Sequence, residues 1–134
     1  MLSLDRVALC CVVAAAAVAA GAWQRLAKRS VYFDFDESNI KEQYFPVITA
    51  HGEYLGKHHK RHVVIQGNAD ERGSAEYNLA LGQRRADALK ERLTLLGMLS
   101  KQAETVSFGE EKPRALGHDE AAWAQNRRAD IVYQ

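Results

Sequence analysis

The chain has few cysteines and little net charge, and both shortages narrow what it can do. Its only two cysteines are Cys10 and Cys11, so no disulfide framework can form in the rest of the 134-residue sequence. The formal net charge at pH 7 is +1, which gives no electrostatic case for nucleic-acid binding. The sequence therefore predicts an ordinary globular domain that folds without disulfide bonds and has no nucleic-acid partner.

Signatures of catalysis and of metal binding are also lacking. No Ser-His-Asp grouping, paired-carboxylate motif or zinc signature is recognisable, so a hydrolase is not favoured. His58, His59 and His62 lie close together, but lysine and arginine lie among them and no carboxylate or cysteine is spaced to complete a zinc site. We therefore expect no enzyme activity, no cofactor and no metal, and we interpret residues 57–62 as a solvated basic connection.

Residues 1–23 are not expected to belong to the fold. An uncharged run rich in Ala and Val extends over residues 7–23, and Ala20, Gly21 and Ala22 provide a small-x-small cleavage site. The run is also at the short limit of the ~17–25 residues that a membrane-spanning helix needs. Both cysteines come too early in it for a bacterial lipoprotein signal. We favour export, and the sequence leaves open whether this segment is cleaved, acylated or kept as an anchor.

The rest of the chain predicts alternating strands and helices. Residues 24–30 read as a short basic linker and residues 31–134 as the domain. The expected order is strand 31–35, a helix from about 43 to 56, strand 62–66, a long helix to about 96, strand 105–108, a short helix 120–124 and strand 128–133. This order implies an α/β (α+β) two-layer sandwich, with a mixed sheet of about four strands covered on one face by the two long helices.

Apolar spacing predicts which face of each long helix is buried. In the first helix, Pro46 is tolerated only in the first turn. The residues expected to face the core there are Val47, Ala50, His51, Tyr54 and Leu55. The second helix has an apolar stripe formed by Leu79, Gly82, Ala86, Leu89, Leu93 and Leu96. Glycine in mid-helix costs ~1 kcal/mol relative to alanine, so we expect Gly82 to mark the close approach of a neighbouring backbone.

The stretch 67–93 is the centre of the functional prediction. Asp70 lies in the loop before the long helix, and Asn78 and Arg85 lie two turns apart on that helix, beside its stripe. An acid, an amide and a guanidinium can thus converge above the carboxyl end of a strand, where open α/β sheets tend to hold ligands. A carboxylate binds an ammonium and an arginine fork binds a carboxylate, so the set suits an amino-acid zwitterion. The alternative is a structural Asp70–Arg85 ion pair, or two unrelated surface charges.

Three ordered blocks of sequence resemble the OmpA C-terminal-like domain, and are most like its peptidoglycan-associated lipoprotein (Pal) branch. The blocks are VYFDFDESNI at 31–40, GNADERGSAEYNLALGQRRADAL at 67–89 and FGEEKPRALGHDEAAWAQNRRADIVY at 108–133. The resemblance implies an OmpA-like fold that binds the meso-diaminopimelate of peptidoglycan stem peptides. On the matching positions, the ligand-binding acid and arginine of the family are Asp70 and Arg85.

The same resemblance implies further site residues. Phe35 and Asp36 follow the first strand, on a segment that lines one wall of the family's pocket, although Asp36 can equally be read as a helix or turn cap. Arg127 and Arg128 follow Asn126, and in the family one arginine of this pair approaches the ligand. The sequence does not decide which of the two it is, and we favour Arg127.

The resemblance also implies a cellular role. It places the chain in the Tol–Pal system, tethering the outer membrane to the cell wall during cell division, with periplasmic Tol proteins as further partners. An alternative is an inner-membrane anchored OmpA-like protein of the flagellar-stator type. Such a protein would carry an ionisable residue inside its membrane span, whereas Asp5 lies before the apolar run, which counts against it.

Overall fold

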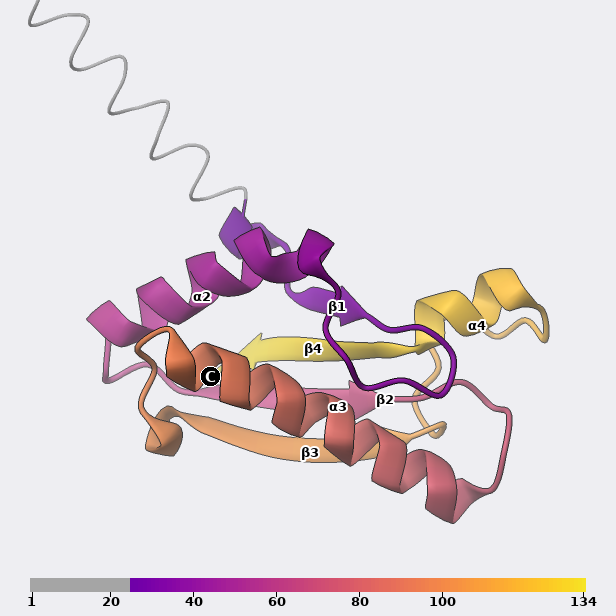
Figure 1. Cartoon of the computed structure of the whole chain (residues 1–134). Coiled ribbons are helices and arrows are strands. Elements are labelled where there is room, and N and C mark those ends of the chain that lie inside the picture. The colour runs from indigo at the N-terminus through magenta and orange to yellow at the C-terminus, as the bar shows by residue number, and fades with distance from the viewer. Residues whose placement is uncertain (1–24) are drawn as a thin grey trace, which may run out of the picture.

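Residues 25–134 are described in this computed structural model, and their strands form one mixed sheet (Figure 1). The strands are β1 (Ser30–Tyr32), β2 (Val63–Asn68), β3 (Ala103–Gly109) and β4 (Arg128–Tyr133). Their order across the four-stranded sheet is β1-β4-β2-β3, in which β2 and β3 are parallel and β4 is antiparallel to both of its neighbours. The segment 1–23 and both cysteines lie outside the described residues, so the expectations for them stay predictions.

The helices form the second layer of the molecule. Helices α2 (Phe45–Lys57) and α3 (Ala75–Leu95) lie over one face of the sheet, and α4 (Glu120–Asn126) lies beyond the end of β2 (Figure 1). Two short 3₁₀ helices, η1 (Glu42–Tyr44) and η2 (Ser100–Gln102), precede α2 and β3. The two-layer arrangement expected from the sequence is confirmed. Within residues 25–134, no helix combines the length and the apolar character that a membrane span requires.

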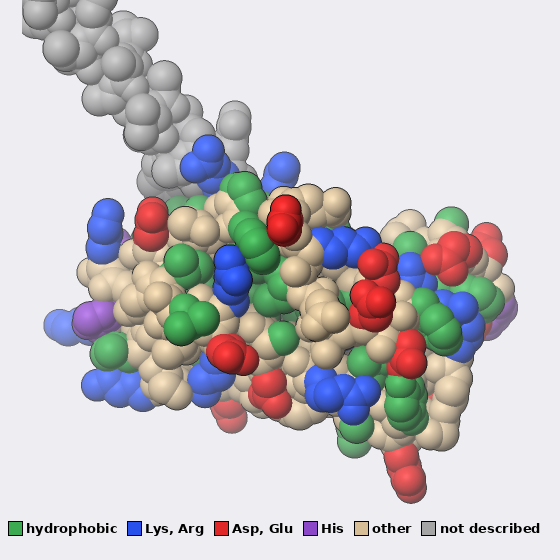
Figure 2. Space-filling view, viewed as in Figure 1, with side chains coloured by type: hydrophobic (Ala, Val, Ile, Leu, Met, Phe, Trp, Pro, Cys, Tyr) green, Lys and Arg blue, Asp and Glu red, His purple; other side chains and the backbone are tan. Residues whose placement is uncertain are grey.

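The hydrophobic core fills the space between the sheet and the two long helices. Its buried members include Ile48, Leu55, Val63, Ile65, Leu89, Leu93 and Ile131. On the outer face of the helical layer, charges of both signs are interspersed with apolar side chains (Figure 2). There the guanidinium of Arg92 on α3 lies 3.8 Å from the ring centre of Phe45 on α2. The side chain of Arg92 thus covers part of the seam between the two helices.

The buried faces of the helices differ in part from the expected ones. Leu79 is 49% exposed, so the prediction that it belongs to the buried stripe of α3 is wrong. Leu81 takes its place, and Asn78 and Arg85 lie on the buried face itself rather than beside it. Most buried polar groups have hydrogen-bond partners, and loop carbonyls supply them for Arg85.

Helix α2 shows a similar mixture. His51 and Leu55 are buried as expected, but the other three predicted core positions of this helix are only half-buried. Ile48 and Gly52 complete the buried face instead. A Cβ on Gly52 would lie 2.5 Å from the Cβ of Leu96, so the absence of a side chain is what lets the two helices meet.

Gly82 marks a close backbone approach, as predicted. A Cβ built on Gly82 would lie 2.3 Å from Oγ of Ser107 and 3.0 Å from the carbonyl oxygen of Gly67. A Cβ built on Gly67 would lie 1.7 Å from the carbonyl oxygen of Gly82, which is closer than any non-bonded contact allows. The two glycines therefore let the backbone of α3 lie directly on the backbone of β2. This contact sets the position of the loop that joins them.

His51 ties the N-terminal linker to the last strand. Its Nδ1 lies 2.6 Å from the hydroxyl of Tyr133, and its Nε2 lies 2.7 Å from the carbonyl oxygen of Lys28. Because a carbonyl only accepts, Nε2 carries the proton and Nδ1 accepts from the tyrosine hydroxyl. Burial lowers the pKa of His51; the bond to Lys28 opposes this shift, and the positive charge of Arg29 adds to it. The folded chain therefore holds a neutral histidine.

We expect this histidine to make folding pH-dependent. Its pKa is lowered from the ordinary 6.5 in the folded state, so the unfolded state takes up the proton first. This contribution to the free energy of unfolding should be fully present well above pH 6.5. It should fall as the pH drops through 6.5, and continue to fall until the pH reaches the lowered pKa of the folded state. Urea denaturation across this window measures the slope. His51→Gln should flatten it and the exposed His59→Gln should not; equal slopes in all three proteins would contradict the assignment.

Candidate ligand-binding site

The candidate site lies where β2 ends and α3 begins. After Asn68 the chain turns through Asp70 and passes Gly73, whose φ of +100° suits glycine. Ser74 then caps α3, because its side chain accepts a 3.1 Å hydrogen bond from the backbone N–H of Tyr77. A strand end, a tight turn and a capped helix thus hold the Asp70 loop in place.

A pocket of about 190 Å³ opens at this loop. It is lined by Phe35, Asp36, Asp70, Arg72, Gly73, Tyr77, Asn78 and Leu81. The tertiary structure thus brings the loop after β1, the β2–α3 loop and the first turns of α3 to one place. Larger hollows lie against α2 and the linker, but this one combines a buried acid with a buried amide. A few convergent polar groups that fix a ligand's orientation are typical of binding sites.

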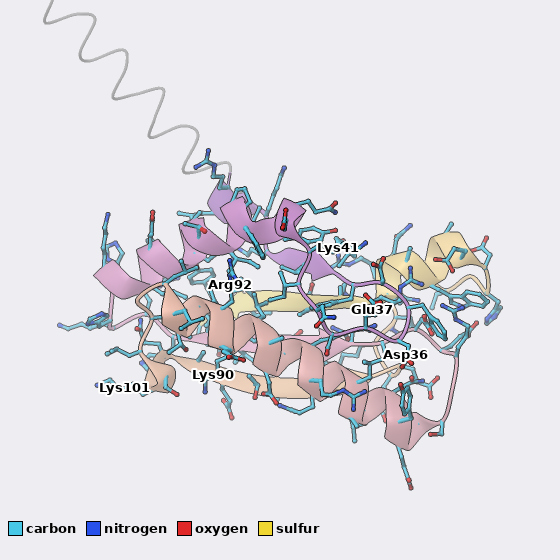
Figure 3. The ribbon with its side chains drawn as sticks, in the orientation of Figure 1. Asp36, Glu37, Lys41, Lys90, Arg92 and Lys101 are labelled. Carbon is cyan, nitrogen blue, oxygen red and sulfur yellow. The ribbon has the colours of Figure 1, made fainter. Side chains whose placement is uncertain are left out.

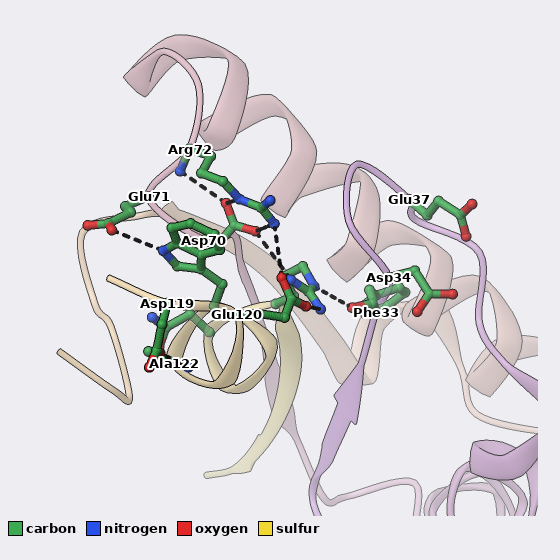
Figure 4. Close-up of polar contacts among 12 residues, drawn as sticks. Phe33, Asp34, Glu37, Asp70, Glu71, Arg72, Asp119, Glu120 and Ala122 are labelled. Carbon is green, nitrogen blue, oxygen red and sulfur yellow. Dashed lines mark hydrogen bonds and ion pairs between the residues drawn. The ribbon is translucent and has the colours of Figure 1, made fainter. Parts of the chain in front are cut away.

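Asp70 is only 4% exposed, and both oxygens of its carboxylate are engaged (Figure 4). Oδ1 accepts hydrogen bonds from the backbone N–H of Arg72 at 3.0 Å and from its Nε at 3.4 Å. Oδ2 accepts a bond from Nη2 of Arg72 at 2.9 Å, and Nη1 of Arg127 lies 3.6 Å away. Burial opposes ionisation of this carboxyl group, but the bonds and charge of Arg72, helped by Arg127, hold its pKa below the ordinary value. Asp70 is thus an ionised carboxylate at the pocket.

Arg72 is a site residue that the sequence reasoning missed. Its guanidinium carbon lies 3.9 Å from the ring centre of Phe35 and 4.2 Å from that of Trp123, so the group is sandwiched between two aromatic rings. The two-residue spacing from Asp70 within one turn is a signal that could have identified it. The stacking partners come from separate parts of the chain and leave no such signal.

A second set of contacts ties this loop to α4. The indole Nε1 of Trp123 donates a 2.9 Å hydrogen bond to Oε1 of Glu71 (Figure 4). Nδ1 of His118 lies 2.7 Å from the same oxygen. Helix α4 is capped by the side chain of Asp119, which accepts a 2.9 Å bond from the N–H of Ala122. The short helix therefore packs against the Asp70 loop from outside the pocket and helps to hold the turn in place.

Arg85 lies behind the pocket rather than in its lining. It is fully buried, and its Nε donates to the carbonyl of Glu37 at 2.9 Å, Nη1 to that of Asn68 at 2.8 Å and Nη2 to that of Asp34 at 3.1 Å. Burial lowers its pKa to about 10, against the attraction of Asp70. Among the ion pairs of the described chain, Asp70 is paired with arginines other than Arg85. In this structure Arg85 fastens the loop after β1 to the end of β2.

That loop carries the two secondary candidates. Strand β1 ends at Tyr32, three residues before the predicted end, and the chain then turns at Asp36, whose φ is +57°. Figure 3 shows Asp36 and Glu37 on this loop. Phe35 is 55% exposed at the pocket mouth. The helix-cap alternative for Asp36 is wrong, because η1 and α2 are capped at other positions, and the residue belongs to a turn instead.

The remaining candidates are Asn78 and the arginine pair before β4. Asn78 is 1% exposed, lines the pocket, and its Nδ2 has no hydrogen-bond partner within residues 25–134. Arg127 lies against Asp70, and its Nε donates to the carbonyl of Phe33 at 2.9 Å. Arg128 turns the other way and donates to Asp130 at 3.0 Å. The geometry therefore favours Arg127 over its neighbour, and a contact of either with ligand stays a prediction.

Comparison with known proteins shows which family this chain and its fold belong to. The OmpA family matches residues 32–128. The peptidoglycan-associated lipoproteins of Pasteurella multocida and Haemophilus influenzae are 53% and 51% identical over 104 residues, which is 78% of this chain and 69% and 68% of theirs. The crystal structure of the peptidoglycan-associated lipoprotein from Burkholderia pseudomallei is 62% identical, with a TM-score of 0.81 over 82% of this chain and 93% of that one. The chain therefore belongs to the OmpA family, in its peptidoglycan-associated lipoprotein branch.

Proposed function

We propose that this chain binds peptidoglycan noncovalently and without cleaving it, through the pocket at the β2–α3 junction. The relatives described above carry peptidoglycan association in their names. The observation that carries the proposal is an ionised, buried carboxylate, Asp70, beside the unpaired amide donor of Asn78 at a pocket open to solvent. Charge-assisted and amide hydrogen bonds at such a place supply binding, and no nucleophile or general base is needed for it.

The ligand that suits this pocket is the zwitterionic end of meso-diaminopimelate. Asp70 would take its ammonium, and Nδ2 of Asn78 would donate to its carboxylate, which removes the cost of a buried unpaired donor. Phe35 and Tyr77 offer apolar walls to the carbon chain. Arg85 supports this arrangement by holding the Phe35 loop and by its positive charge. A direct bond from Arg85 to the ligand requires that loop to move, because carbonyls occupy its donors in this structure.

The wider role follows from the ligand. A domain that binds the wall and is held at the outer membrane would tether one to the other. We therefore propose that this chain acts as a periplasm-facing member of the Tol–Pal system, with Tol proteins as partners. The inner-membrane alternative is less favoured. Relatives from several organisms, each about 50% identical to this chain, are all named peptidoglycan-associated lipoproteins. Outer-membrane attachment depends on the segment 1–24, which lies outside the described residues.

Calorimetric titration of the full chain in mild detergent with a diaminopimelate-containing muropeptide tests this proposal. We expect the wild type to bind and Asp70→Asn to weaken binding about 30-fold or more, the ~2 kcal/mol or more that loss of a desolvated charge partner costs. The matched control is Asp87→Asn, an exposed aspartate on α3 that accepts a bond from Gln83 and carries the same charge. Binding that survives in Asp70→Asn, or that falls equally in the control, would refute the site.

A further inference from the structure

We propose that Arg72 is an internal occupant of the ammonium half of the pocket, which the ligand must displace before it can bind Asp70. This inference rests on the proposed function. Arg72 grips the carboxylate through two side-chain bonds, at 2.9 Å and 3.4 Å, and covers an acid that is otherwise at the pocket. A guanidinium in this position does what a ligand ammonium would do: it neutralises Asp70 and fills its acceptor sites.

The side chain of Arg72 and a ligand ammonium cannot both bind the carboxylate of Asp70 at the same time. Asp70 is almost fully buried, and Arg127 lies against the same Oδ2 that Arg72 contacts. A ligand ammonium therefore reaches the acid only if the side chain of Arg72 leaves. The backbone N–H of Arg72 keeps its 3.0 Å bond to Oδ1 when that happens. The exchange replaces one cation by another, so the carboxylate is never left buried and unpaired, which would cost several kcal/mol.

The structure also provides a second position for the displaced arginine. Nη2 of Arg72 is already 3.9 Å from Oε2 of Glu120, on α4, and Glu120 is largely exposed. The other oxygen of this carboxylate, Oε1, is held at 2.9 Å by Arg127, so Oε2 is the one that faces Arg72. The rings of Phe35 and Trp123 flank the guanidinium of Arg72, which can move parallel to them without losing either stacking contact. A short movement therefore exchanges one carboxylate partner for another.

This arrangement makes Arg72 a determinant of affinity and specificity. The apparent affinity of a site equals its intrinsic affinity reduced by the fraction of molecules that are open to the ligand. A cation that binds weakly would not displace a forked, stacked arginine, whereas a ligand with an ammonium and additional contacts would. The internal occupant thus excludes small cations at the cost of some affinity for the wall peptide.

Titration of the full chain with the same muropeptide tests the inference through Arg72→Ala. We expect binding to become roughly tenfold tighter, because the site is no longer occupied in most molecules. Arg92→Ala is the matched control: it removes an arginine that is also stacked on an aromatic ring, with the same charge change, at the other end of α3. Methylguanidinium added to Arg72→Ala should fill the empty slot and weaken binding again, and it should not affect the wild type.

Glu120→Gln provides a second, independent reading. It should weaken binding in the wild type, where displaced Arg72 loses its acceptor, and have a smaller effect in Arg72→Ala. If the wild type binds, Asp70→Asn does not, and Arg72→Ala binds equally or more weakly, the inference is overturned while the proposed function stands. If only Arg72→Ala binds the muropeptide, the inference about Arg72 is supported. If neither the wild type nor any variant binds it, both the inference and the proposed function are refuted.

Discussion

Replacing Arg85 with methionine is expected to lower the free energy of unfolding by ~3–5 kcal/mol, because three carbonyls lose hydrogen bonds from a charged donor, each worth ~1.5–3 kcal/mol, less the cost of burying the guanidinium. The carbonyl of Asn68 would lose its donor in a buried place, and those of Asp34 and Glu37 would lose theirs in partly buried ones. Methionine has a flexible side chain of similar length, so the cavity it leaves is small and the loss reports mainly on the hydrogen bonds. Urea denaturation near neutral pH measures the change.

Arg84→Met is the control for this substitution. Arg84 is the preceding residue of α3 and is exposed, so its loss should change stability by less than about 0.5 kcal/mol. Amide hydrogen exchange should show the loop of residues 33–37 opening in Arg85→Met and not in Arg84→Met. A loss of stability equal to that of the control would mean that the three carbonyl bonds contribute nothing. A loss of ligand binding in Arg85→Met would not by itself show that Arg85 contacts the ligand, because opening of the loop 33–37 is enough to disrupt the pocket.

Gly67→Ala is expected to have the largest effect on folding, about 4 kcal/mol or more, which places it among exceptional single substitutions. The added Cβ would lie 1.7 Å from the backbone carbonyl oxygen of Gly82, and backbone cannot rotate away as a side chain can. Either α3 moves off the sheet or the chain does not fold. Near-ultraviolet circular dichroism and soluble yield report on this directly.

Two further glycine variants set the scale. Gly82→Ala meets the flexible Oγ of Ser107 first, and the backbone of Gly67 only at 3.0 Å, so its cost should be smaller than that of Gly67→Ala. Gly117→Ala lies in a loop, where its Cβ would approach that of Ala122 at 3.2 Å and need a shift of only a few tenths of an ångström. A Gly67→Ala protein as stable as Gly117→Ala would show that the contact between α3 and β2 is not tight.

The local elements of the fold could be predicted because their signals are local. The predicted strand 62–66, the short helix 120–124 and the strand 128–133 each depend on a few adjacent residues, and each corresponds to an element of the structure. Strand ends were less predictable. Strand β1 stops at Tyr32, where its partner β4 begins at Arg128, and β2 runs on to Asn68 because β3 accompanies it. Pairing with a distant strand, rather than propensity, decides where a strand ends.

The binding residues divide in the same way. Spacing along one helix and one turn was enough to predict that an acid, an amide and an arginine belong to one strand–turn–helix unit, and that Gly82 admits a close backbone. Contacts between distant segments were needed to show that Arg85 faces three carbonyls instead of the pocket, and that Arg72 lies between two rings and is bonded to Asp70. The direction of a long charged side chain depends on which acceptors distant segments bring near it, and no local pattern contains that information.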